Sequence, residues 1–259
     1  MLKKASFMGA FFCLLFTQTY AVASFCPPPA SVAEFSVKYV IDGDTLRLQD
    51  DRRIRLLGID TPELGGWGRA TQPYARKAQQ RLAELVKANG NKVAVSVGEQ
   101  NHDRYGRVLA HLYGQHGASL EEQLIAEGLA YHVVIAPNVA LAHCLAQAES
   151  KARGQGVGLW KNARFIPANQ IKAAGFTLLQ GRIQSVQRNK GGVWLDLGHS
   201  VVINIPSDAL QYFSQFQPLE SLVGRDVQAR GWISERKAQQ KKYAKWRLTV
   251  SYPSMLELQ

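Results

Sequence analysis

The sequence predicts an α+β fold, in which a five-stranded β-barrel with three helices is followed by a second small, mainly β barrel. Two observations predict it. Before residue 162, apolar residues recur with the period of strands in some segments and of helices in others. After residue 175, strand-like runs dominate. Between these parts, residues 162–175 show neither period. With 259 residues, the chain is also longer than most single compact domains.

Five half-buried strands are predicted in the first part, because apolar and polar residues alternate there. The runs are Phe35–Ile41, Leu46–Leu48, Ile54–Leu56, Val93–Val97 and Arg107–Tyr113. Asp50–Arg53, between the second and third runs, has the composition of a solvated hairpin loop.

Three helices are predicted between and after these strands. Pro73–Asn89 carries apolar residues at helical spacing and ends before a glycine. Ser119–Glu122 is a capping box that opens a short helix ending at Gly128. Asn138–Arg153 is the third helix, and Gly154 is its expected stop. Leading strands with helices packed at one end indicate an α+β domain built on a small barrel.

The second part reads as an OB-type barrel. Its strand-like runs are Phe176–Val186, Val193–Leu197, Val201–Ile205, Val227–Ile233 and Trp246–Val250. A helical patch at Ser207–Phe216 separates the third run from the fourth, which is the order of an OB-type barrel. The predicted organisation is a leader at 1–23, an N-terminal segment at 24–34, a first domain at 35–161, a linker at 162–175 and an OB-like domain at 176–259.

The leader has the order of a bacterial secretory signal peptide. Lys3 and Lys4 precede the apolar run Phe7–Phe16, and small residues lead to Ala23. We predict cleavage after Ala23 and a periplasmic or secreted, monomeric protein without a membrane span. The alternative is an uncleaved anchor, but the run is shorter than the ~20 apolar residues that a spanning helix needs.

Composition favours a folded, basic protein. Hydrophobic residues make up 46% of the chain, which excludes general disorder, and 31 Lys and Arg against 20 Asp and Glu give a formal net charge of +11. Such a charge suits polyanions, either nucleic acid or an anionic envelope surface. Colloidal solubility alone is the competing interpretation.

Acidic residues nevertheless gather in residues 40–63, VIDGDTLRLQDDRRIRLLGIDTPE. Carboxylates in a small volume repel one another unless positive charge lies between them. A metal ion or a phosphate-binding arginine would provide that charge, so Asp42, Asp44, Asp60 and Glu63 are candidate site residues.

Three motifs in order, VIDGDTLRL, IRLLGIDTPE and DRYGRVLAHLY, followed by GLW at 158–160, closely resemble the staphylococcal-nuclease-like (thermonuclease) family over residues 35–160. The resemblance implies a calcium-dependent nuclease that acts on DNA and RNA, with Ca²⁺ as cofactor and with 3′-phosphate and 5′-hydroxyl products. It also implies roles for eight residues: Asp44, Asp60 and the Thr61 carbonyl as metal ligands, Glu63 as the acid–base or water-positioning group, Arg55 and Arg107 as phosphate clamps, and Arg104 and Tyr105 as substrate-binding residues.

General chemistry agrees with these roles. Calcium prefers oxygen ligands, and a metal with two guanidinium groups would stabilise charge on a phosphoryl group. For Arg107 the alternative is an ion pair with Asp103. The family's tyrosines after the second helix are not matched here, and Tyr131 is the candidate to replace them in base stacking.

The C-terminal part contains a cationic loop that predicts nucleic-acid binding. Its candidate residues are Lys241, Lys242, Tyr243, Lys245, Trp246 and Arg247. The competing interpretation places Trp246 in the core with Leu248 and Val250, because these residues alternate. If the loop only retains substrate, a chain ending at Lys161 is expected to keep cleaving short oligonucleotides.

Two cysteines, Cys26 and Cys144, remain after the leader departs. An oxidising compartment predicts a disulfide between them, with two unpaired thiols as the alternative.

Two other functions stay open: a non-catalytic nucleic-acid-binding module and an envelope interaction protein. Retention of Arg55, Glu63 and Arg107 favours the nuclease.

Overall fold

The computed structural model of the chain describes residues 26–29, 32–66, 68–236 and 243–259. The predicted leader, together with Lys241 and Lys242, lies outside the described residues. Within the described ranges, every helix is too short or too polar to cross a bilayer.

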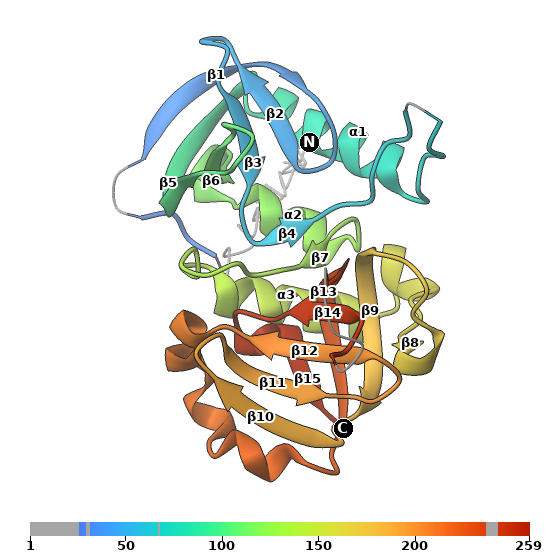
Figure 1. The fold of residues 1–259 in the computed structure, drawn as a ribbon. Helices are drawn as coiled ribbons and strands as arrows, with labels where there is room; N and C mark the ends of the chain where they lie inside the picture. Colours follow the sequence, from blue (N-terminus) through green and yellow to red (C-terminus); the bar gives the residue numbers. More distant parts are fainter. Residues whose placement is uncertain (1–25, 30–31, 67, 237–242) are drawn as a thin grey trace, which may run out of the picture.

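The predicted five-stranded barrel is confirmed. Its strands are β1 Ala33–Val40, β2 Thr45–Leu48, β3 Arg53–Leu56, β5 Lys92–His102 and β6 Val108–Tyr113, and they close in the order β1-β2-β3-β6-β5 (Figure 1). Neighbouring strands are antiparallel except β3 and β6, which are parallel. Alternate side chains such as Leu46, Ile54 and Ala110 fill the barrel, as the period of two requires.

The helices are α1 Ala75–Ala88, α2 Leu120–Ala126 and α3 Ala142–Gly154. The Ser119 hydroxyl accepts a hydrogen bond from the Glu122 amide, so the predicted cap is confirmed. However, α3 begins four residues later than Asn138. The Asn138 carboxamide accepts from the Gln100 amide at 2.9 Å and donates to the Gln100 carbonyl at 3.0 Å, which holds it in a loop.

The C-terminal part contains the predicted second, mainly β unit, here called the C-terminal sheet. Its strands are β8 Ile166–Pro167, β9 Gly175–Arg182, β10 Ser185–Asn189, β11 Gly192–Asp196, β12 Val201–Ile205, β13 Asp226–Glu235, β14 Trp246–Thr249 and β15 Leu256–Leu258. The 3₁₀ turns of the chain are Gln115–Gly117, Gly158–Lys161, Ala168–Gln170, Ser207–Phe216, Leu219–Leu222 and Pro253–Met255.

The pairing order of this sheet repeats that of the barrel. Its path is β10-β11-β12-β14-β13-β9-β8, with β12 and β14 parallel. If β9 and β10 are counted as one bent strand, this strand corresponds to β1 of the barrel. The strands β11, β12, β14 and β13 then correspond to β2, β3, β6 and β5 in turn. Residues 162–175, interpreted above as a linker, add β8 to the edge of the sheet, and Ala168 is buried against it.

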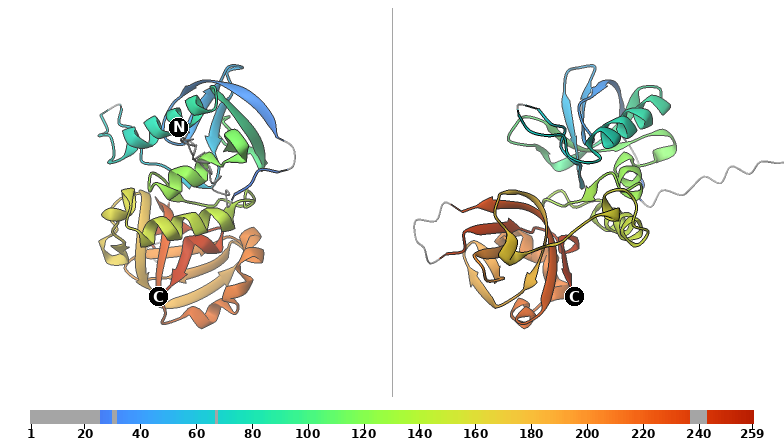
Figure 2. Two further views of the ribbon diagram at one scale, coloured as in Figure 1. Left: turned by 180° about the vertical axis from the view of Figure 1, so that it is seen from behind. Right: turned by 90° about the vertical axis from the view of Figure 1, so that its right-hand side faces the viewer.

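Helix α3 lies between the barrel and the C-terminal sheet (Figure 2). Its Glu149 carboxylate forms an ion pair with Arg230 of β13, and both side chains are buried. Arg153 of α3 donates to Glu257 and to Gln228, at 2.7 Å in each case. Apolar residues from both sides also share one core, because Val134 and Ala142 pack with residues of the C-terminal sheet. The two parts therefore form a joint interior.

A short pair of strands extends this contact toward the barrel. β4 Ile59–Asp60 pairs with β7 Tyr131–His132, with Asp60 opposite Tyr131. The His132 ring bonds with the Gly58 carbonyl at 2.9 Å and with the Ser254 hydroxyl at 3.0 Å. Burial and the nearby Arg230 charge lower the pKa of His132 to about 3, so the ring is neutral. A neutral ring donates to the carbonyl and accepts from the hydroxyl.

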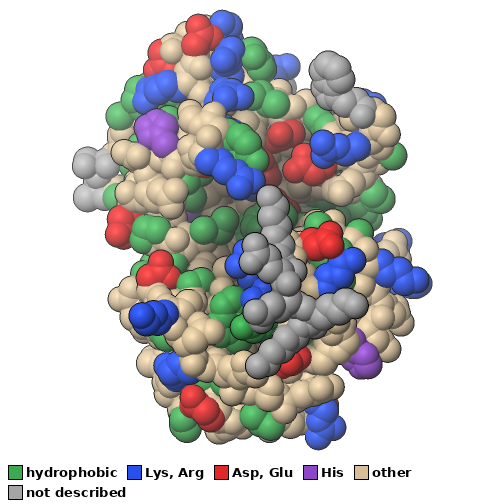
Figure 3. Space-filling model, viewed as in Figure 1, with side chains coloured by type: hydrophobic (Ala, Val, Ile, Leu, Met, Phe, Trp, Pro, Cys, Tyr) green, Lys and Arg blue, Asp and Glu red, His purple; other side chains and the backbone are tan. Residues whose placement is uncertain are grey.

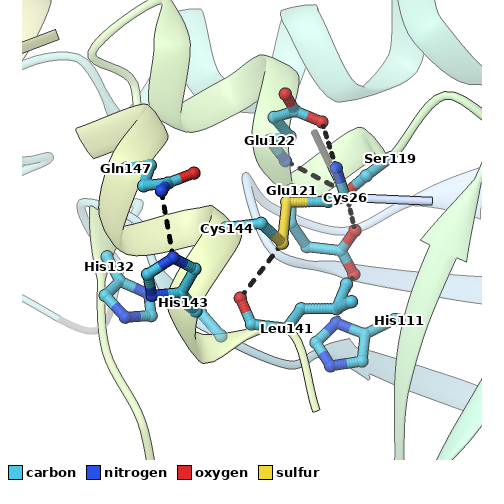
Figure 4. Close-up of a disulfide and its surroundings, with 11 residues drawn as sticks. Cys26, His111, Ser119, Glu121, Glu122, His132, Leu141, His143, Cys144 and Gln147 are labelled. Carbon is cyan, nitrogen blue, oxygen red and sulfur yellow. Dashed lines mark hydrogen bonds and ion pairs between the residues drawn. A yellow bond between two sulfur atoms is a disulfide. The ribbon is translucent and has the colours of Figure 1, made fainter. Parts of the chain in front are cut away.

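The predicted disulfide is confirmed. Cys26 and Cys144 are bonded, and their Cα atoms are 5.5 Å apart (Figure 4). The Cys26 amide donates to the Glu122 carboxylate at 3.3 Å, which places the segment before β1 against α2 as well as α3. The bond joins residues 118 positions apart.

The disulfide is expected to stabilise the fold, because it limits the freedom of the unfolded chain over a long loop. We predict that the double variant Cys26→Ser, Cys144→Ser loses about 2–5 kcal/mol of unfolding free energy. Urea unfolding of the oxidised wild type, the reduced wild type and the variant measures this. The two latter proteins are expected to agree; a variant with the midpoint of the oxidised protein would contradict the prediction.

Candidate active site

An open cleft of about 610 Å³ collects most of the residues that the sequence singled out. Figure 3 shows a hollow between the two parts, with acidic side chains in it and basic side chains near it. The charged residues that line the cleft are Asp42, Asp44, Asp60, Glu63, Asp103, Arg55, Arg104 and Arg107. Among these described residues acids outnumber bases by two, so the cleft is acidic although the chain as a whole is basic.

The turn after β1 brings two of these acids together. The Asp42 carboxylate accepts from the Asp44 amide at 3.0 Å, as aspartates in turns do. Gly43 lies between them, and a Cβ atom there would come within 2.7 Å of both the Ala78 Cβ and the Thr61 Oγ1. Only glycine therefore lets this turn approach α1 and the segment after β4.

Asp44 is fixed from two directions. Its Oδ2 accepts from the Thr61 amide at 2.9 Å and from the Thr61 hydroxyl at 3.0 Å. Its Oδ1 accepts from the Thr45 hydroxyl and pairs with Arg55. This carboxylate thus joins the β1–β2 turn to the end of β4.

Arg55, on β3, lies between two carboxylates. Its Nε is 3.1 Å from Asp44 Oδ1, and its second terminal nitrogen is 3.2 Å from Asp60 Oδ1. The other terminal nitrogen donates to the Leu56 and Ile59 carbonyls. The side chain is only 14% exposed, so these bonds hold the guanidinium group in one orientation.

Burial and, to a lesser degree, repulsion between carboxylates raise the pKa values of Asp60 and Asp42. Burial raises the pKa of Asp60 to about 7, and repulsion by Asp44, Glu63 and Asp42 adds to it, while Arg55 opposes the shift. Burial and repulsion by Asp44 likewise raise the pKa of Asp42 to about 6. One guanidinium group does not fully compensate this set of carboxylates.

Glu63 is more exposed than the aspartates and follows them on the segment after β4. Gln72 fixes its backbone: the Glu63 amide donates to the Gln72 side chain at 2.8 Å, and the Gln72 amide donates to the Glu63 carbonyl at 3.0 Å. The Glu63 side chain is therefore presented to the cleft from an anchored segment.

Arg107 forms the ion pair that was the alternative interpretation of its role. Its Nε is 2.7 Å from Asp103 Oδ2, and its amide donates to the same carboxylate. Burial tends to raise the pKa of Asp103, but hydrogen bonds from Arg107 and the Tyr105 amide outweigh it, and the pKa falls below its usual value. The pair still lines the cleft, so Asp103 orients Arg107 there.

Tyr105 lies at the tip of the same turn and is exposed. The Arg104 guanidinium lies over its ring and also donates to its hydroxyl at 2.8 Å. Both side chains line the cleft, as the sequence predicted for substrate-binding residues.

Two predicted stacking residues are corrected by the structure. Tyr131 packs against Phe176 and Trp160 and is half-buried between the barrel and the C-terminal sheet, so its ring is not available to a base. Trp246 is 6% exposed and belongs to the core, because alternation along β14 turns it inward with Leu248.

The other residues of the cationic loop lie at the surface. Tyr243 is exposed and lies under the Arg236 guanidinium. Lys245 pairs with Glu235 at 3.4 Å, and Arg247 is half-buried on β14. Nucleic-acid binding by these residues stays a prediction.

Sequence reasoning missed three residues of the site. Gln72 anchors Glu63, Asn138 anchors Gln100 beside the cleft, and Trp232 of β13 lines the cleft from the C-terminal sheet. Asn138 and Trp232 are placed by contacts between residues distant in sequence, and Gln72 by a contact across the loop that follows Glu63. No local motif marks any of the three.

The donor set is compatible with a hard cation. Across the described ranges, no three His, Cys, Asp or Glu side chains are already arranged as a metal cage. In the cleft, Arg55 contacts both Asp44 and Asp60. All acidic groups of the cleft nevertheless supply oxygen atoms, which calcium prefers, and their excess over the arginines matches the charge of a divalent ion.

The chain is similar in sequence to known nucleases. A family model described as staphylococcal nuclease homologue matches residues 53–162. A thermonuclease of Staphylococcus hyicus is 32% identical over 137 residues, which cover 51% of this chain and 79% of that protein. An uncharacterized endonuclease of Escherichia coli is 32% identical over 131 residues, which cover 49% of this chain and 77% of that protein.

Proposed function

Because the chain belongs to the staphylococcal nuclease family and is therefore a nuclease, we propose that it hydrolyses phosphodiester bonds of DNA and RNA with Ca²⁺ as cofactor. The observation that carries this proposal is the arrangement of Arg55 between Asp44 and Asp60, in a cleft that also contains Glu63 and Arg107. We further propose, on the basis of its leader, that the mature protein is periplasmic or secreted, and that it is a monomer.

Asp44, Asp60 and the Thr61 carbonyl oxygen would hold the calcium ion. These residues lie next to one another, because Thr61 follows Asp60 directly and donates two hydrogen bonds to Asp44. Asp44 and Asp60 line the cleft, whereas Thr61 is buried behind them and is not among the described residues that line it. Bound there, calcium would add positive charge beside the phosphoryl oxygens.

Arg55 and Arg107 bind and orient the phosphate. A guanidinium group can bond two oxygens of one phosphate and stays charged at all working pH values. Each is held by carboxylates, Arg55 by Asp44 and Asp60 and Arg107 by Asp103, so little ordering is needed when substrate arrives. The two guanidinium groups stabilise the transition state more than the bound substrate, because negative charge grows on the phosphoryl oxygens during attack.

Glu63 accepts the proton of the attacking water or orients that water. The water oxygen forms a bond to phosphorus, the bond from phosphorus to the 5′ oxygen breaks, and the proton given up by the water passes to that oxygen through Glu63 or through solvent. The products are then a 3′-phosphate and a 5′-hydroxyl. The Glu63 side chain is exposed and its segment is anchored, which suits a group that must contact both the water and the substrate.

We expect the purified mature chain to cleave single- and double-stranded DNA and RNA with Ca²⁺, and to lose activity in EGTA even when Mg²⁺ is present. Magnesium keeps its octahedral water shell and suits an open carboxylate site less well. Gel analysis of labelled substrates measures cleavage, and kinase labelling without phosphatase detects the 5′-hydroxyl ends. Restored cleavage on adding back calcium is the control.

Two outcomes would count against the proposal. Full activity with magnesium in EGTA would remove calcium as the cofactor. Binding of nucleic acid without cleavage under every metal condition would instead support the non-catalytic alternative.

A further inference from the structure

The C-terminal sheet contributes an aromatic side chain to the cleft. Trp232 of β13 lines the same cleft as Asp44, Asp60 and Arg107 and is 39% exposed. Its neighbour Ile233 is buried in the core of the sheet, and alternation along the strand therefore turns Trp232 outward. A large apolar ring left exposed in a cleft indicates a binding surface.

Neighbouring rings fix the position of Trp232. It contacts Phe176 edge-on, with centroids 5.6 Å apart, and Phe176 is stacked on Tyr131 at 5.1 Å. Tyr131 pairs with Asp60 across β7 and β4. A continuous path of packed rings and paired backbone thus connects Trp232 with one of the acids of the site, so the ring is held in place before any ligand arrives.

The apolar lining of the cleft suits a nucleobase. Val133 and Ile135 line the cleft together with Trp232, and Ile135 is exposed. The three arginines of the cleft suit the phosphates of the same strand, and a calcium ion bound as proposed would offset the excess of carboxylates there. Aromatic faces beside a positively charged groove are the arrangement that binds single-stranded nucleic acid, because every base can stack on a ring.

On the basis of the proposed function, we propose that Trp232 stacks on an unpaired base next to the phosphate being cleaved. The C-terminal sheet is then part of the substrate cleft, and it gives the enzyme a preference for single-stranded substrate. In a duplex both faces of each base are covered by neighbouring bases, so stacking on Trp232 requires a base that has left the stack.

The test compares Trp232→Ala with Trp232→Phe, which keeps a ring, and with Tyr39→Ala. Tyr39 is an aromatic residue of β1, 48% exposed and outside the set of described residues that line the cleft. Affinity is measured by fluorescence anisotropy in a Glu63→Gln background with Ca²⁺, so that the probes stay intact. The probes are a labelled thymidine decamer, the same decamer as a duplex, and a decamer of abasic sites.

We expect Trp232→Ala to weaken binding of the single-stranded decamer about tenfold, the scale of one lost stacking contact. Trp232→Phe is expected to recover most of this affinity, and Tyr39→Ala to leave it unchanged. The effect should be small for the duplex and absent for the abasic decamer, because neither offers a free base face. Thermal unfolding of each variant checks the fold.

Equal losses on the thymidine and abasic decamers would overturn the inference, as would no loss on either, and Trp232 would then only cover the contact between the two parts. Wild-type cleavage separates this result from failure of the proposed function. A wild-type protein that cleaves DNA while Trp232→Ala binds normally rejects the stacking role alone.

Discussion

Glu63→Gln is expected to lower the rate of phosphodiester cleavage about a hundredfold or more, the scale for losing a group that acts in the transition state. Glutamine keeps the size and shape of the side chain but is uncharged and cannot accept the proton. Because Glu63 is exposed and its segment is held by backbone bonds to Gln72, the fold should not change. Initial rates on a labelled oligonucleotide with saturating calcium measure the effect.

Glu84→Gln is the matched control, since this exposed glutamate of α1 pairs only locally with Arg81 among its described ion pairs. It should cleave at the wild-type rate. Near-wild-type turnover by Glu63→Gln with an unchanged circular dichroism spectrum would remove Glu63 from the mechanism. Arg55 is a poorer first target, because its removal would leave Asp44 and Asp60 without their shared cation and disturb the fold as well.

Arg230→Ala is expected to destabilise the whole protein by about 3–5 kcal/mol, the scale for removing one partner of a buried ion pair. Arg230 pairs with Glu149 in the interior between α3 and β13, and it also donates to the Ser254 carbonyl at 2.7 Å. Burial already raises the pKa of Glu149, and Arg230 opposes that shift. Without the arginine, a buried carboxylate would have to ionise unpaired or take up a proton.

Urea unfolding compares Arg230→Ala with Arg188→Ala, which breaks an exposed pair with Glu220 and should cost less than about 1 kcal/mol. A double variant in which Arg230 and Glu149 both become methionine should recover much of the stability, because no charge is then left unpaired. Equal midpoints for the two single variants would show that the buried pair does not hold the two parts together.

The same contacts change what a truncated chain is expected to do. A protein ending at Lys161 would lose the partner of Glu149 and uncover Val134 and Trp160, which are buried in the whole chain. It would also lose the Ser254 hydroxyl that bonds to His132, on the strand paired with Asp60. The expectation that such a chain cleaves short oligonucleotides independently is therefore not supported by the structure.

Local sequence patterns were enough to predict the barrel, the run of strands after it and most of the charged residues of the acidic cleft. Strand periodicity is local, and the motifs around Asp44, Asp60 and Arg107 place their residues on neighbouring strands and turns once the barrel closes. The pairing of Cys26 with Cys144 also followed, because the expected mature chain has only these two cysteines.

The interior shared by the two parts could not be predicted from local patterns. Tyr131 was a candidate for base stacking, but its ring is covered by Phe176, a residue from the other part of the chain. Trp232 carries no motif, yet it lies at the cleft because β13 packs on α3 through Arg230 and Glu149. Such contacts join side chains that are far apart in the sequence. Local periodicity describes only neighbouring residues, so it does not predict them.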